Sequence, residues 1–220
     1  YGTESLNNEN IKGYNLPLGA TNIMTTGKEY DNIYPVWDWT RIPGTTAIGN
    51  QDKTSLEGYQ IGNNEFGGGV SDGVNGIIAY KGKYNELQAN KAYFFFDNMM
   101  FCIGSDISYV QNDNVLTSVE QNLLNGEVIY NDGQEKQLSS NSNMQLKQLK
   151  WVYHNNTGYI FRGTDNVTIQ NMPQAGSWKD INATGESGLI DKNVFSVWIN
   201  HGLNPENASY QYIVVPDKSI

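Results

Sequence analysis

The sequence has 220 residues, of which 38% are apolar and only 17% charged, which suits one large β-domain or two small ones with a substantial core. The net charge of −9 argues against nucleic-acid binding, because such surfaces are basic, and no apolar run approaches the roughly 18 residues of a membrane span. The single cysteine, Cys102, excludes an internal disulfide and is expected to be a small buried hydrophobe.

Strand signals recur along the chain, and turns rich in glycine and asparagine separate them. The expected strands cover residues 21–25, 76–80, 92–103, 106–110, 116–123, 150–153, 158–161, 167–170, 194–200 and 210–215. Helical periodicity is nearly absent, and the best helix candidate is the short, Asn- and Gln-rich segment 139–149. A long Gly- and Asn-rich stretch, residues 48–72, is predicted to be a loop, which is often functional in compact β-domains.

Two of these strands indicate the architecture. Residues 92–103 read AYFFFDNMMFCI, which predicts one strand covered on both faces and therefore sheets stacked in layers. Residues 195–200 read FSVWIN and alternate more, as in a strand with one face in water. Together they predict an all-β fold, a large multi-sheet antiparallel β-sandwich.

An aromatic segment at residues 29–46 is the first candidate for sugar binding. Trp37 and Trp39 flank Asp38 at the spacing of one strand face, and an indole ring can stack on the apolar face of a pyranose. The alternative is that both tryptophans belong to the core, which is favoured because Trp is highly buried on average.

Other polar residues are expected to be structural. His154 and His201 lie far apart in the sequence and are interpreted as structural or surface histidines. Asp72 follows Glu65 in a Gly-rich stretch, where a turn is favoured over a cation site because the spacing is not that of an EF-hand. Taken alone, the polar run 4–10 looks like a frayed terminus.

Several segments carry a resemblance to a known family. They are residues 4–23, 29–46, 65–76, 90–107, 158–161, 176–182 and 197–216, which include EYDNIYPVWDWTRIPGTT, EFGGGVSDGVNG and VWINHGLNPENASYQYIVVP. The sequence resembles polysaccharide lyase family 8, the chondroitin AC, hyaluronate and xanthan lyases, and is most similar to the chondroitin AC type. The segments occur in the family's order and span almost the whole chain.

The resemblance implies a fold and an activity. Members of this family carry an N-terminal α/α-toroid, a central β-sandwich of the galactose-mutarotase-like supersandwich type and a C-terminal β-domain. Residues 1–220 match the central part alone, and the chain begins at Tyr1 without Met, so we expect a piece of a larger bacterial lyase, secreted to the periplasm or outside the cell. The family cleaves uronic-acid polymers by β-elimination, with its catalytic Asn, His, Tyr and Arg in the toroid. By itself the piece is expected to be inactive.

Two residues of this chain match active-site positions of the family. The family's E-x-x-N pair corresponds to Glu4 and Asn7. The resemblance implies that Glu4 helps to organise the Arg/His network of the toroid and that Asn7 contacts the sugar. The expected partners are therefore an acidic polysaccharide of the glycosaminoglycan type and the toroid of the same parent chain. This reverses the interpretation of the run 4–10 as a frayed end.

No metal or other cofactor is expected. Some chondroitin AC lyases bind calcium through acidic and Tyr ligands near the VW-x-W motif. At the matching positions this sequence keeps Asp38 and has Thr40, Gly49 and Asn50 for the other three. One carboxylate is too few for a Ca²⁺ site, so none is predicted there.

Two other functions remain open from the sequence. A non-catalytic carbohydrate-binding module would bind oligosaccharides through exposed Trp or Tyr, independently of Glu4 and Asn7. A structural sandwich of an adhesin would bind no sugar and would have no adjoining toroid.

Overall fold

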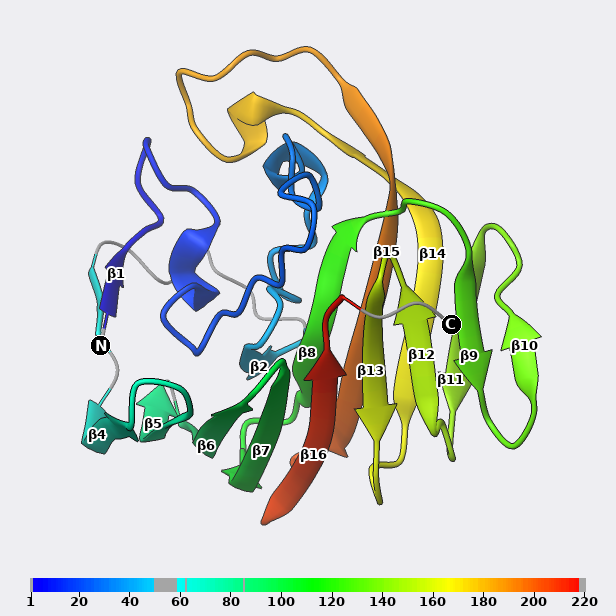
Figure 1. Ribbon diagram of the computed structural model, residues 1–220. Helices are drawn as coiled ribbons and strands as arrows, with labels where there is room; N and C mark the ends of the chain where they lie inside the picture. The colour runs from blue at the N-terminus through cyan, green and yellow to red at the C-terminus, as the bar shows by residue number, and fades with distance from the viewer. Residues whose placement is uncertain (1, 50–58, 62, 85, 218–220) are drawn as a thin grey trace.

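Two antiparallel sheets, one of nine strands and one of five, make up most of the molecule (Figure 1). The structure is a computed structural model, which describes residues 2–49, 59–61, 63–84 and 86–217. A short third sheet pairs β1 (Gly2–Glu4) with β3 (Tyr59–Ile61). The predicted all-β antiparallel sandwich is confirmed.

The strand order differs from the chain order in both large sheets. The nine-stranded sheet runs in the order β10 (Glu135–Gln137), β9 (Val128–Asn131), β12 (Trp151–His154), β13 (Thr157–Phe161), β16 (Ala208–Val215), β7 (Met99–Ser108), β6 (Leu87–Phe96), β5 (Gly76–Tyr84) and β4 (Asn63–Ser71). The five-stranded sheet runs in the order β11 (Ser142–Leu146), β14 (Val167–Gly176), β15 (Ile190–Leu203), β8 (Asn114–Leu123) and β2 (Thr46–Ile48).

Helical structure in the described residues is limited to three single turns of 3₁₀ helix. They are η1 (Gly13–Asn15), η2 (Tyr34–Val36) and η3 (Trp178–Asp180). No helix in this part of the chain is both long enough and apolar enough to span a membrane.

The main core lies between the two large sheets. Tyr159 and Tyr212 from the nine-stranded sheet meet Phe195 and Ile169 from the five-stranded sheet, and each is at most 1% exposed. A fully buried side chain of this size contributes about 2–3 kcal/mol relative to an exposed one. Burial of alternate side chains on facing sheets therefore holds the sandwich together.

The apolar run 92–103 is a hairpin and not the single strand that its composition predicts. Asp97 adopts φ 49°, and the chain turns between β6 and β7. Tyr93 and Met100 point into the core, whereas Phe94 and Phe101 lie half-buried on the other face of the sheet. Both faces of this hairpin are apolar, so the apolar composition continues through the turn. The composition of the run could therefore not show where one strand ends and the next begins.

Residues 194–199 of strand β15 are buried on both faces, so the prediction of one wet face at residues 195–200 is wrong. Ser196 and Trp198 face away from the main core but are only 2% and 7% exposed. The Arg41 guanidinium lies 4.1 Å from the centre of the Trp198 ring and helps to cover this side. The alternation therefore marks two different environments, both of them buried.

Three other element predictions also need correction. The predicted helix within 139–149 is instead strand β11, which pairs with β14. Residues 21–25 form no strand. Much of the predicted loop 48–72 is strand, because it contains β3 and β4, while residues 50–58 and 62 lie outside the described residues.

Residues 5–45, here called the N-terminal coil, contain η1 and η2 and no strand. In Figure 1 the coil is the blue segment above β4–β6 and beside β8. It packs around a small second core made of Ile33, Val36, Trp37 and Ile42, together with Val194 of β15. The coil carries Asn7, and Glu4 precedes it directly at the end of β1, so both residues that the family resemblance marks for the active site lie at its start.

Candidate functional site

Glu4 and Asn7 lie together at the start of the N-terminal coil. Glu4 ends strand β1, and its Oε1 accepts a hydrogen bond of 3.1 Å from the Asn7 side-chain amide. The Asn7 Oδ1 accepts bonds from the backbone N–H of Glu9 (3.0 Å) and Asn10 (2.8 Å). The side chain of Asn7 therefore shapes the turn and orients the Glu4 carboxylate.

Asn10 closes the same turn from the other side. Its amide nitrogen donates to the Glu4 backbone oxygen at 2.8 Å, and its side-chain oxygen accepts from the Gly13 N–H at 2.8 Å. Short polar side chains that bond the backbone in this way stabilise turns. The segment 4–13 is thus an ordered turn, and the Glu4 side chain is exposed at its surface.

Backbone bonds fasten this turn to the region around η3. The Ile11 N–H donates to the Ile181 oxygen at 3.1 Å, and the Ala183 N–H donates to the Asn8 oxygen at 2.7 Å. The β1–β3 pairing, which places Glu4 opposite Tyr59, holds the other end. An asparagine amide has two N–H donors, so Asn7 can still donate one hydrogen bond besides the bond to Glu4.

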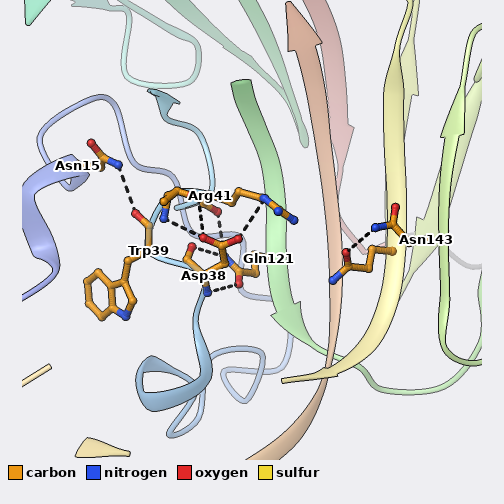
Figure 2. Close-up of polar contacts among 8 residues, drawn as sticks. Asn15, Asp38, Trp39, Arg41, Gln121 and Asn143 are labelled. Carbon is orange, nitrogen blue, oxygen red and sulfur yellow. Dashed lines mark hydrogen bonds and ion pairs between the residues drawn. The ribbon is translucent and has the colours of Figure 1, made fainter. Parts of the chain in front are cut away.

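Asp38 belongs to a second polar cluster, drawn in Figure 2, where β8 meets the coil. The Gln121 side chain accepts from the Asp38 N–H (2.8 Å) and donates to the backbone oxygens of Asp38 (3.1 Å) and Arg41 (2.9 Å). One buried glutamine therefore satisfies three backbone groups of the coil. On the coil's far side, the Asn15 amide donates to the Trp39 oxygen at 3.3 Å.

Both carboxylate oxygens of Asp38 are engaged within the coil. Oδ1 accepts from the N–H (3.0 Å) and the hydroxyl (2.6 Å) of Thr40, and Oδ2 forms an ion pair with the Arg41 Nε at 3.1 Å. Arg41 already balances the charge of Asp38. The described residues hold no group of three or more His, Cys, Asp or Glu suited to a metal, while Asn50 lies outside them.

The two tryptophans of the aromatic segment have different roles. Trp37 is 5% exposed, donates its indole N–H to the Gln121 oxygen at 3.0 Å and belongs to the second core. Trp39 is half-buried, with its ring centre 5.6 Å from that of Trp37. They lie beyond η2 and not on a strand, so the expected common strand face is wrong.

Glu120 is a buried carboxyl group that the sequence did not single out. Its Oε1 accepts from the Tyr30 hydroxyl at 2.6 Å, and its Oε2 accepts from the Tyr159 hydroxyl at 2.9 Å. Burial raises the pKa of Glu120 to about 7, although these two hydrogen bonds act in the opposite direction. The pair of tyrosines joins the coil to β13 through this one side chain.

Lys91 is a second buried charge on the inner face of β6. Its ammonium group donates to the backbone oxygens of Gly44 and Leu18, and the neighbouring Tyr93 hydroxyl donates to Gly19 at 2.9 Å. Burial lowers the pKa of Lys91 to about 7. Its position in the inward series Leu87, Ala89, Lys91 was the one sequence signal that could have marked it.

The remaining candidates have structural roles. Burial lowers the pKa of His154 and of His201 to about 4, and their ring nitrogens bond the Asn125 N–H and the Thr117 hydroxyl, respectively. Cys102 is fully buried, and burial raises the pKa of its thiol to about 11. Asp72 accepts from the N–H groups of the two residues Val74 and Asn75, as in the predicted turn.

Comparison with known proteins adds the wider context. The sequence model for polysaccharide lyase family 8, super-sandwich domain, matches residues 1–220. Chondroitinase-AC of Pedobacter heparinus is 42% identical over 97% of this chain and 31% of its own length, and xanthan lyase of Bacillus sp. strain GL1 is 30% identical over 98% of this chain and 25% of its own. The chain thus spans about a third or less of the length of these curated relatives.

Solved structures agree with this similarity. A structure of chondroitinase AC lyase has a TM-score of 0.89 at 41% identity, covering 99% of this chain and 32% of that chain. A structure of Paenibacillus xanthan lyase has a TM-score of 0.88 at 28% identity, covering 98% of this chain and 22% of that chain.

Proposed function

Since the chain belongs to polysaccharide lyase family 8, as its super-sandwich domain, we propose that it is the central domain of a lyase that cleaves uronic-acid-containing polysaccharide by β-elimination. Its relatives are named for chondroitin, hyaluronate and xanthan. The family assignment does not favour the alternative of a stand-alone carbohydrate-binding module. The domain supplies one wall of the substrate cleft, and an N-terminal toroid of the same parent chain supplies the other.

The ordered turn at Glu4 and Asn7 is the observation that carries this proposal. An exposed carboxylate whose orientation is fixed by an adjacent amide suits a bidentate bond to an arginine on a facing domain. Such a bond would hold the guanidinium where the reaction needs positive charge. The remaining N–H of Asn7 points to a donor role toward a sugar hydroxyl.

The chemistry explains why charge must be brought in from outside this domain. The proton removed in β-elimination lies beside an ionised uronate carboxylate, so donors must neutralise that carboxylate before a base can act. This chain carries 14 Lys and Arg against 23 Asp and Glu, a poor environment for an acidic polymer. The catalytic cations and the base therefore belong to the partner domain, and residues 1–220 alone are expected to be inactive.

The location follows from the substrate class. The proposed substrate is a polysaccharide, which does not enter a cell intact. The parent lyase is therefore proposed to act in the periplasm or outside the cell.

Replacing Glu4 in the parent polypeptide tests the proposal. Glu4→Gln and Glu4→Ala are expected to lower turnover by about 100-fold, because a misplaced catalytic group costs on this order. Turnover is measured from the ultraviolet absorbance of the unsaturated product. Circular dichroism is expected to be unchanged, since the Glu4 side chain is exposed.

Glu9 provides a matched control in the same turn. Its side chain is exposed, and its bond to Asn7 uses only the backbone N–H, so Glu9→Gln is expected to leave turnover unchanged. Unchanged turnover in Glu4→Ala would reject the role of Glu4, and full activity from residues 1–220 alone would reject the division of labour between domains.

A further inference from the structure

A polar groove lies on the outer face of the nine-stranded sheet, the face that points away from the five-stranded sheet. It crosses β4, β5, β6 and β7 and has a volume of about 370 Å³. Its lining side chains are Asn63, Asn64, Lys81, Lys83, Gln88, Asn90 and Asp106. Small-ligand sites commonly have volumes of about 300–1,000 Å³.

The groove is built from cross-strand neighbours in two rows. In one row Lys83 pairs with Asn63 on β4 and with Gln88 on β6. In the other row Lys81 pairs with Phe66 and Asn90. Paired residues share a face of the sheet, so both lysines and their neighbours point the same way.

Two irregularities in the sheet flank these rows. The β4–β5 register shifts between Asn63 and Phe66, and the β6–β7 register shifts between Gln88 and Asn90. At the second shift Asp106 adopts φ 54°. Bulges redirect side chains and concentrate next to binding sites. Here the first shift lets Asn63 and Phe66, three residues apart on β4, lie on the same outer face.

An apolar hollow of about 210 Å³ adjoins the polar groove and shares Lys81 and Asn90 with it. Its floor includes Ala92 and Ile103, and Phe66 stands at its rim with 53% of its side chain exposed. The combined surface therefore offers an aromatic ring and an apolar floor beside ammonium and amide groups. A sugar ring has an apolar face and a polar rim, which match these two parts.

The donors of the groove select an acidic ligand. Lys81 and Lys83 place two ammonium groups on one strand of a chain whose net charge is −9. The Gln88 and Asn90 amides donate to Asp106 Oδ2, the Asn90 bond at 3.5 Å, which fixes both amides and leaves their oxygens to accept from hydroxyls. Lysine attracts carboxylate and sulfate groups, and amides bond sugar hydroxyls.

We propose that this groove binds a segment of an acidic oligosaccharide, with Lys81 and Lys83 on its carboxylate or sulfate groups and Phe66 against a sugar ring. The identity of the polymer rests on the proposed function, but the groove does not depend on turnover. The strand β4 that forms its edge begins two residues after β3, which pairs with the strand that ends at Glu4. The polymer would thus be held by the domain that also presents Glu4.

Calorimetry on the 220-residue chain with a chondroitin sulfate hexasaccharide tests the proposal. Binding is expected, and it should weaken as salt is raised because the interaction is between charges. The double variant Lys81→Ala/Lys83→Ala is expected to lower the affinity at least about tenfold, since two charge-assisted bonds are lost. Phe66→Ala is expected to weaken it less, and neutral maltohexaose should bind more weakly than the acidic sugar.

Lys147→Ala/Lys150→Ala provides the control, because it removes the same charge from two exposed lysines beside β12. It is expected to leave the affinity unchanged. An equal loss of affinity in both double variants would mean that net charge, and not the groove, determines binding, and would overturn the proposal. So would a loss on Glu4→Ala with none on Lys81→Ala/Lys83→Ala, which would leave the proposed function standing. Unchanged affinity in Lys81→Ala/Lys83→Ala would also overturn the site, whatever the effect of the two substitutions on stability.

Discussion

The sandwich and the N-terminal coil are held in place by different forces. The sandwich buries alternate apolar side chains between two sheets, as at Tyr159 and Phe195. The coil has a small apolar core, and most of its path is fixed by side chains that bond its backbone, as Gln121, Lys91 and Asn10 do. The coil is therefore positioned by directional contacts at single residues, whereas the sandwich relies on area spread over many.

This difference explains where the candidate active-site residues lie. Where β1 ends at Glu4, the chain can turn and present Glu4 and Asn7 at its surface because the side chains of Asn7 and Asn10 satisfy backbone groups within the turn. Because single side chains hold the backbone of the coil, one substitution among them is expected to destabilise a whole segment of it. The next three predictions test this comparison.

Phe195→Ala in β15 should have the largest effect. Phe195 is fully buried, with its ring 4.4 Å from that of His154 and 6.3 Å from that of Tyr159. The cavity and lost burial are expected to lower the free energy of unfolding by about 3–5 kcal/mol in urea titrations, with coil and sandwich unfolding together. Phe96→Ala, at a hairpin end and 44% exposed, is the control and should cost far less. Equal losses would contradict burial as the basis of the sandwich.

Glu120→Gln should change how stability depends on pH, because Glu120 connects the two regions. Its pKa is raised in the folded state from an ordinary 4.5 to about 7, so the protonated form favours folding. That contribution is fully present below pH 4.5 and is lost as the pH rises through 7. Wild type is therefore expected to lose up to about 3 kcal/mol more than Glu120→Gln over this window.

Urea unfolding at a series of pH values measures this difference. Comparison of the two proteins at each pH cancels the contributions of the other buried groups. Parallel pH profiles for wild type and Glu120→Gln would show that the Glu120 carboxyl is not destabilised by burial.

Gln121→Ala should have a smaller, local effect. It leaves the Asp38 N–H and two backbone oxygens of the coil without their partner, which is expected to cost about 2 kcal/mol. Hydrogen exchange should quicken at Asp38 and its neighbours and stay unchanged in β15. Gln145→Ala, on the exposed side of β11, is the control. Quicker exchange throughout the sandwich would mean that the two regions are not separable.

Strands with clear alternation and bounding turns could be predicted from the sequence. Residues 158–161 and 210–215 lie within β13 and β16. The hairpin at Asp97 was missed because both of its faces are apolar, and β11 was missed because its strand form comes from edge pairing with β14 and not from its own composition. The segment 21–25 has strand-like residues but finds no partner strand.

The candidate site was less accessible to sequence reasoning. Glu4 and Asn7 could be named only through a family resemblance, because a polar run has no periodicity to interpret. Their roles stay a prediction. Glu120 could not be found and Lys91 was marked only by its place in the inward series of β6, since each bonds residues that lie many positions away in the chain, such as Tyr30 and Gly44. Burial of a charged residue in a strand depends on those distant partners.

The side chains that fix the N-terminal coil bond its main chain. Gln121 bonds backbone groups of Asp38 and Arg41, Lys91 bonds the oxygens of Gly44 and Leu18, and Tyr93 bonds that of Gly19. These hydrogen bonds depend on the position of the backbone and not on the identity of the side chains that the coil carries. Substitution of the outward-facing side chains of this segment is therefore expected to leave the path of its backbone unchanged.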